Sequence, residues 1–251
     1  MTFVQHHVEG QIHTITLDDP ARRNAMSLEL FDALDDVISA VQATEDARVI
    51  VVRGNGKAFC AGFDLARAVE QPDVMATFIR RLSGVIRDLR RMPGVVIMAV
   101  HGAAIAGGCA LITAGDFVFV TRSCTLGYPV HPIGVSPAVT IPSLSMKLGE
   151  GGARAMLLGG KLIKGDDAHA IGLATHVVDD DQLDRAVAEQ ISRTLQKGAH
   201  ALKVTKAWLN ELDGSLDDAR FDGPSEGSCD LTTEPEAVEM LARFWQARTA
   251  R

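Results

Sequence analysis

The sequence has little of what several large protein classes require. Its 25 Lys and Arg are outnumbered by 32 Asp and Glu, for a net charge of −7 over 251 residues. This balance disfavours a nucleic-acid surface, although three Arg-Arg pairs leave room for local positive patches. No apolar run is long enough to span a membrane, and the first residues lack the basic-then-apolar pattern of a signal peptide. We therefore expect a cytoplasmic protein with no membrane or nucleic-acid partner.

Several catalytic and binding motifs are missing as well. HExxH, a Walker loop, a nucleophile elbow and a complete GxGxxG are all absent. The four cysteines show no CxxC spacing, which predicts free thiols in a reducing compartment rather than disulfides or a metal site. They are Cys60, Cys109, Cys124 and Cys229.

Two similar stretches carry most of the information that is present. In the first, an apolar, β-branched run from Val95 to Val100 predicts a strand buried on both faces. Small residues then lead to Gly107-Gly108, where a short helix is expected to begin. Glycines at a helix start let a group approach its free N–H groups, which favour negative charge such as an enolate oxygen. The alternative is that the two glycines only let this helix pack closely on the sheet.

The second stretch repeats the arrangement earlier in the chain. A strand over Val49 to Val52 is followed by a turn and then by Lys57-Ala-Phe-Cys-Ala-Gly-Phe-Asp-Leu65. A strand again gives way to small residues and a helix, so each junction could supply one N–H group to the same oxygen.

Together, Ala-Phe-Cys-Ala-Gly-Phe-Asp-Leu and Gly-Ala-Ala-Ile-Ala-Gly-Gly-Cys resemble the crotonase superfamily, also called the enoyl-CoA hydratase/isomerase family. The resemblance covers nearly the whole chain. It implies an α/β crotonase fold, with stacked ββα units forming two roughly perpendicular sheets and a helical C-terminal region. We place the acyl-CoA-binding core at 1–195 and the helical region at 196–251, where family members make oligomer contacts and close the site. The segment Gly223-Pro-Ser-Glu-Gly227 is expected to interrupt this helical region.

By this resemblance, the substrate is an acyl-CoA thioester and no metal or redox cofactor is implied. Its carbonyl oxygen would be held by the backbone N–H groups of Ala61 and Gly107, with Gly62, Phe63 and Asp64 beside it. Asp64 is expected chiefly to cap the following helix. The resemblance also implies a homotrimer or a dimer of trimers.

Other contacts follow from the same resemblance. The loop from Pro20 to Ala25 would run along the nucleotide end of coenzyme A, where Arg22 or Arg23 could contact a phosphate. Phe63, Met75 and Phe78 are candidates to line the acyl pocket, with core packing as the alternative.

The chain departs from a typical hydratase at the acid–base positions. The two hydratase glutamates are replaced by Ala110 and Val130, and the acid of some isomerases is replaced by Ala138. Tyr128 and His131 remain nearby, and an imidazole suits proton transfer at neutral pH. The alternative for His131 is a position in a rigid loop, facing solvent or a neighbouring chain.

Three functions are consistent with this pattern. The first is an acyl-CoA enzyme that relies on enolate stabilisation, for isomerisation, decarboxylation, or thioester or C–C cleavage, with His131 or Tyr128 assisting. The second is ordinary enoyl-CoA hydration. The third is an acyl-CoA-binding protein without catalysis. The sequence does not identify the acyl group.

Overall fold

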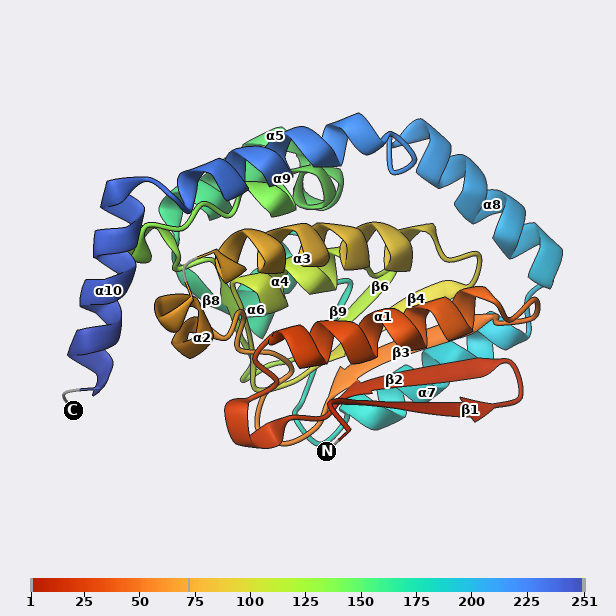
Figure 1. Ribbon diagram of the computed structural model, residues 1–251. Helices are drawn as coiled ribbons and strands as arrows, with labels where there is room; N and C mark the ends of the chain where they lie inside the picture. Colours follow the sequence, from red (N-terminus) through yellow and green to blue (C-terminus); the bar gives the residue numbers. More distant parts are fainter. Residues whose placement is uncertain (1, 72, 250–251) are drawn as a thin grey trace.

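Two β-sheets and a surrounding layer of helices make up the mixed α/β fold of the computed structural model, which describes residues 2–71 and 73–249 (Figure 1). The larger sheet has the strand order β1-β2-β3-β4-β6-β9. The bounds of these strands are Val4–Glu9, Ile12–Leu17, Val49–Gly54, Val95–Val100, Phe117–Thr121 and His176–Val178. The first two strands form an antiparallel hairpin, and every later neighbour is parallel.

The central strands are apolar because both faces of the large sheet are covered. On β3, Ile50 and Val52 belong to the main core, whereas Val49 and Val51 belong to a second cluster on the opposite face. Figure 1 shows α1 and α3 over one face and α7 against the other. The strands expected at Val49 and Val95 are thus confirmed, together with the two-sided burial that their composition indicates.

Ten α-helices lie in the described residues. The first five are α1 (Leu28–Gln42), α2 (Leu65–Glu70), α3 (Val74–Arg91), α4 (Gly107–Leu111) and α5 (Ile141–Gly159). The others are α6 (Gly165–Ala170), α7 (Leu183–Leu195), α8 (Ala199–Leu212), α9 (Asp218–Leu231) and α10 (Pro235–Thr249). None of the helices in the described part of the chain has the combined length and apolar composition needed to cross a membrane.

The smaller sheet joins the two junction segments. It consists of β5 (Ala103–Ile105), β7 (Thr125–Gly127) and β8 (Leu162–Lys164), and it begins directly after β4. An isolated bridge pairs Cys60 with Ala104, so the segment that follows β3 lies against the segment that follows β4. The carboxyl ends of two neighbouring parallel strands therefore deliver both junctions to the same place.

The helix α9 corrects the expectation that Gly223 to Gly227 interrupts the C-terminal region. The helix runs through this segment with Pro224 inside it. Proline removes one helical hydrogen bond, and tertiary contacts override this local cost. Four side chains of α9 are buried against the core: Phe221, Ser225, Ser228 and Cys229. Arginines of α3 add ion pairs with α9 at 2.7–2.9 Å: Arg80–Glu226, Arg87–Asp222 and Arg91–Asp218.

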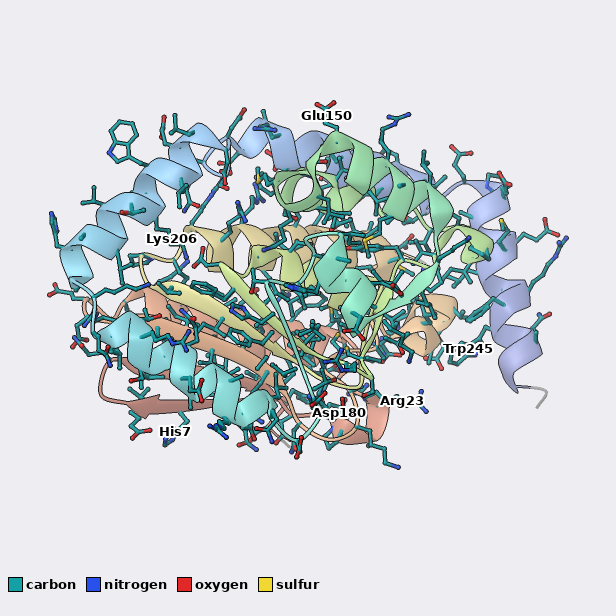
Figure 2. The ribbon with its side chains drawn as sticks, turned by 180° about the vertical axis from the view of Figure 1, so that it is seen from behind. His7, Arg23, Glu150, Asp180, Lys206 and Trp245 are labelled. Atoms are coloured by element: carbon teal, nitrogen blue, oxygen red, sulfur yellow. The ribbon has the colours of Figure 1, made fainter. Side chains whose placement is uncertain are left out.

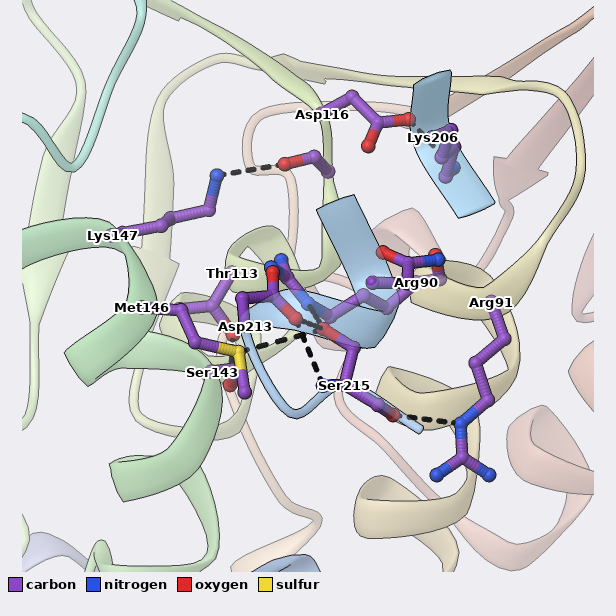
Figure 3. A network of polar contacts seen from close by, with 12 residues as sticks. Arg90, Arg91, Thr113, Asp116, Ser143, Met146, Lys147, Lys206, Asp213 and Ser215 are labelled. Atoms are coloured by element: carbon purple, nitrogen blue, oxygen red, sulfur yellow. Dashed lines mark hydrogen bonds and ion pairs between the residues drawn. The ribbon is translucent and has the colours of Figure 1, made fainter. Parts of the chain in front are cut away.

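Polar contacts also attach α8 and the loop after it to the core (Figure 3). The buried Lys206 Nζ donates to the Gly94 carbonyl at 2.8 Å and to Asp116 Oδ2 at 2.7 Å. At the end of α3, Arg90 donates to Asp213 and Ser215, both at 2.5 Å. The helical region beyond residue 196 therefore packs on the core through specific contacts.

Candidate active site

A buried asparagine holds the first junction in shape. Asn24 is fully buried and has a φ of 55°, a left-handed conformation that asparagine tolerates better than most residues. Its Nδ2 donates to the carbonyls of Asn55, Ala58 and Phe59 at 2.9–3.1 Å, and its Oδ1 accepts from the Asp19 N–H. One side chain thus ties the loop around Pro20 to the segment that follows β3.

The backbone pairing of this segment corrects the expected role of Ala61. The Ala61 N–H donates to the Arg23 carbonyl at 3.0 Å, so it is already used within the fold. On either side of Phe63, the Gly62 carbonyl and the Asp64 N–H both bond to Met26. Successive groups in an extended segment alternate in direction, so the Phe63 N–H points away from Met26. Among the described residues, it has no hydrogen-bond partner.

The second junction brings another free N–H group to the same place. The residue before Gly107, Ala106, has a φ of 51° and a ψ of −113°, a conformation that non-glycine residues seldom adopt. Directly after this turn α4 begins, and the Gly107 N–H has no partner in the described part of the chain. A free N–H at a helix start is a donor suited to an anion.

The glycines show how close the two junctions are. A Cβ on Gly62 would lie 2.9 Å from the Ile105 carbonyl oxygen and 3.6 Å from the Gly107 nitrogen. A Cβ on Gly107 would lie 3.3 Å from the Phe63 ring, whereas one on Gly108 would lie 2.4 Å from the Cys60 carbonyl oxygen. Gly108 therefore serves close packing, and Gly107 faces the space in front of Phe63.

That space is a cavity of about 290 Å³, and its lining is almost entirely apolar. Ala61, Phe63, Gly107 and Met75 line it, as do Ala110 and Val130. Phe78 does not line it; the Phe78 ring packs in the core, with its centroid 5.5 Å from that of Phe63. No Asp, Glu, His, Lys or Arg of the described residues is among its lining side chains, and the polar ones are Tyr128, Ser136 and Thr140.

Among the described residues, Tyr128 is the only one in that lining with an ionisable side chain. It is 1% exposed, and its hydroxyl lies 3.2 Å from Thr140 Oγ1. Burial raises the pKa of this hydroxyl well above its usual value. Tyr128 can therefore donate a hydrogen bond or a proton at neutral pH, but it does not act as a base there.

His131 does not reach the cavity. It begins the short 3-10 helix His131–Ile133, its side chain is exposed, and it is not among the lining residues. The hypothesis that His131 shuttles protons in the site is therefore wrong for this conformation. The alternative stated for it, a rigid loop with His131 facing outward, matches the structure.

The charged candidates near the first junction have structural contacts. Asp64 caps α2 by accepting from the Arg67 N–H at 3.3 Å. Arg22 lies between two carboxylates, with Nε 2.6 Å from Asp19 and Nη1 3.1 Å from Asp64. Arg23 is exposed and has no ion-pair partner among the described residues; Figure 2 shows it at the opposite end of the molecule from Lys206.

The cysteines in the two junctions are packing residues. Both Cys60 and Cys109 are fully buried, and burial raises the pKa of each thiol to about 12. A thiol with so high a pKa is a poor nucleophile at neutral pH.

Comparison with known proteins is consistent with this geometry. A family model described as enoyl-CoA hydratase/isomerase matches residues 7–220. The 1,2-epoxyphenylacetyl-CoA isomerase of Escherichia coli K12 is 32% identical over 231 residues, 86% of this chain and 87% of that protein. The short-chain-enoyl-CoA hydratase of Clostridium acetobutylicum is 27% identical over 239 residues, 93% of this chain and 91% of that protein. The crystal structure of an enoyl-CoA hydratase/isomerase from Mycobacterium paratuberculosis has a TM-score of 0.85 and 25% identity, and covers 97% of this chain and 98% of its own.

Proposed function

Because the chain belongs to the enoyl-CoA hydratase/isomerase family, we propose that it acts on an acyl-CoA thioester by stabilising the enolate. The oxyanion hole of this proposal consists of the Phe63 and Gly107 N–H groups. Both residues line the cavity, both N–H groups lack partners in the described residues, and backbone donors fixed in place stabilise developing negative charge. Phe63 takes the place first assigned to Ala61.

The apolar lining of the cavity is the observation on which we choose between the possible reactions. Hydration needs one group to activate water and another to deliver a proton, and two carboxylates commonly do this. Here those positions carry Ala110 and Val130. We therefore favour reactions that depend mainly on enolate stabilisation: isomerisation, decarboxylation, or thioester or C–C cleavage.

Decarboxylation fits these groups most directly. When carbon dioxide leaves, the electron pair of the broken C–C bond moves onto the thioester to form the enolate, so no base is required. The α-carbon of the enolate, a much stronger base than a phenolate, then takes a proton from the buried Tyr128 hydroxyl, and water reprotonates the tyrosinate before the next turnover. The carboxylate is also disfavoured in an apolar cavity, and its loss relieves that cost.

The nucleotide part of coenzyme A would then lie outside the cavity, near the loop that contains Arg22 and Arg23. Arg22 already pairs with two carboxylates, whereas Arg23 has no ion-pair partner among the described residues. We therefore assign the phosphate contact to Arg23, because a free guanidinium binds phosphate well.

Mass spectrometry of an acyl-CoA panel tests the proposal. Saturated, α,β-unsaturated, β,γ-unsaturated and carboxylated thioesters are each incubated with the protein. Loss of carbon dioxide or a shifted double bond supports enolate chemistry, and release of coenzyme A supports thioester cleavage through a tetrahedral oxyanion held in the same oxyanion hole. A gain of water would instead establish ordinary hydration, despite Ala110 and Val130. Tight binding without turnover would identify a non-catalytic acyl-CoA-binding protein.

Two variants then test which side chain takes part. Tyr128→Phe removes the proton donor and is expected to slow turnover by about 10²-fold or more, the range typical of a positioned acid. His131→Ala is the matched control and is expected to leave the rate unchanged. Equal rates in Tyr128→Phe and the wild type would remove Tyr128 from the chemistry, and a slow His131→Ala variant would return His131 to it.

A further inference from the structure

A second cavity lies beside the first. It has a volume of about 60 Å³ and lies between α2, α10 and the loop after the 3-10 helix His131–Ile133. Its wall is apolar apart from Thr232, and residues such as Ala68, Val69 and Leu241 contribute to it. Three side chains line both cavities: Met75, Ile133 and Val135.

Met75 is the most adaptable of these three side chains. It lies in the first turn of α3 and is 2% exposed, so it does not face solvent. Because it lines both cavities, it lies between them in this conformation. Methionine is unbranched and changes rotamer more readily than the branched isoleucine and valine beside it.

We propose that the two cavities are successive parts of one acyl channel, and that Met75 is the specificity-determining residue between them. The distal methylenes of a long, unbranched, apolar acyl chain occupy the second cavity when Met75 turns aside. Shorter chains end in the first cavity, against Met75. This inference rests on the proposed function, since it assumes that the first cavity holds the acyl group.

Chain length should therefore control affinity in two regimes. Each buried methylene contributes a factor of about four to affinity, from the free energy of burying apolar surface. We expect affinity to rise by this factor per carbon until the chain reaches Met75, and then to level off, because the cost of turning Met75 aside offsets the gain from burying the next methylenes. Met75→Ala joins the cavities and should extend the range of chain lengths over which affinity rises by at least two methylenes. Met75→Trp should shorten that range.

The experiment is isothermal titration of the full-length protein with saturated acyl-CoA esters from butanoyl to hexadecanoyl, with free coenzyme A as the reference. Met92→Ala is the matched control, because Met92 is a buried methionine at the other end of α3 that lines neither cavity. Val238→Phe fills the second cavity from α10 without altering the first; Val238 is 41% exposed, so this change is tolerated. When Val238→Phe is combined with Met75→Ala, affinity should stop rising at the same chain length as in the wild type.

The outcomes separate the inference from its premise. If no acyl-CoA binds the wild type better than coenzyme A does, the proposed function fails. If affinity rises with chain length but levels off at the same carbon in the wild type, Met75→Ala and Met75→Trp, the assignment of Met75 is overturned while the acyl-CoA proposal stands. An extension seen equally in Met92→Ala would also overturn it.

Discussion

At the scale of single residues, Asn24 has more influence on the site than its position suggests. It does not line the cavity, yet its side chain bonds to four backbone groups of the two segments that position Phe63. Its left-handed backbone conformation adds a second requirement. In the sequence, Asn24 is only one residue of the loop from Pro20 to Ala25, and nothing in that loop indicates these bonds.

Asn24→Ala should lower the free energy of unfolding by about 3 kcal/mol, because it leaves several buried backbone groups without a partner. Asn24→Gly loses the same bonds but accepts the positive φ, so it should recover about 1 kcal/mol of that loss. Urea unfolding of the three proteins measures both differences. A loss below 1 kcal/mol in Asn24→Ala would show that the side chain is not what holds the junction.

At the scale of secondary structure, the predictions were confirmed for the elements that local sequence patterns alone determine. The strands Val49–Gly54 and Val95–Val100 and the helix that begins at Gly107 follow from apolar runs and glycine positions. The helix α9 was missed because Gly223, Pro224 and Gly227 locally disfavour a helix. Its ion pairs to α3 join residues more than 120 positions apart, so no local pattern contains them.

The contact between α5 and the core makes a prediction at the same scale (Figure 3). Lys147 of α5 donates to the Gly115 carbonyl at 2.7 Å, and burial, with a smaller effect of the Arg90 charge, lowers its pKa to about 8. In the unfolded chain a lysine keeps its proton up to about pH 10.4. Between these values the unfolded state binds more protons, so the contribution of Lys147 to stability rises with pH from about 8 to about 10.4.

Lys147→Met should therefore reduce the rise in unfolding free energy across that pH window. Urea unfolding at pH 7.5, 8.5 and 9.5 measures the slope, and Lys203→Met, at an exposed position of α8, serves as the control. If the unfolding free energy changes with pH equally in the wild type and in Lys147→Met, Lys147 is not the source of the pH dependence.

At the scale of the whole molecule, α8 to α10 form an outer layer over the core (Figure 1). In this layer α10 contributes Phe244 to the wall of the main cavity. The exposed surface of α8 includes an apolar patch: Trp208, Leu209 and Leu212 are 61%, 60% and 80% exposed. Such a patch is typical of a contact between proteins, and we propose that it lies in the homo-oligomer that the family resemblance implies.

This proposal predicts a mass of about three or six times the 26.8 kDa of one chain in sedimentation equilibrium. The double variant Trp208→Asp with Leu212→Asp should sediment as a monomer, because it places two charges in the apolar contact. Leu158→Asp, at a site on α5 that is 72% exposed, should leave the assembly intact. A wild-type monomer, or an oligomer unaffected by the double variant, would refute this role of α8.

The site as a whole was predictable only in part, and the limit is physical. Both junctions and the helix cap at Asp64 could be inferred from the sequence. The sequence could not show which N–H group is free, because the Ala61 N–H donates to the carbonyl of Arg23, which is distant in the chain. The outward position of His131 likewise depends on how its loop packs, which residue type does not determine.

The proposed oxyanion hole, in which backbone N–H groups hold the thioester oxygen in an apolar cavity, is tested most directly by infrared difference spectroscopy. A saturated acyl-CoA with a ¹³C-labelled thioester carbonyl is bound to the wild type and to Tyr128→Phe. We predict that the carbonyl stretch moves to a lower frequency than in water, and equally in both proteins, because Phe63 and Gly107 polarise the bond rather than Tyr128. A bound carbonyl with the frequency it has in water would contradict the oxyanion hole, and a shift lost in Tyr128→Phe would assign the polarisation to the tyrosine instead.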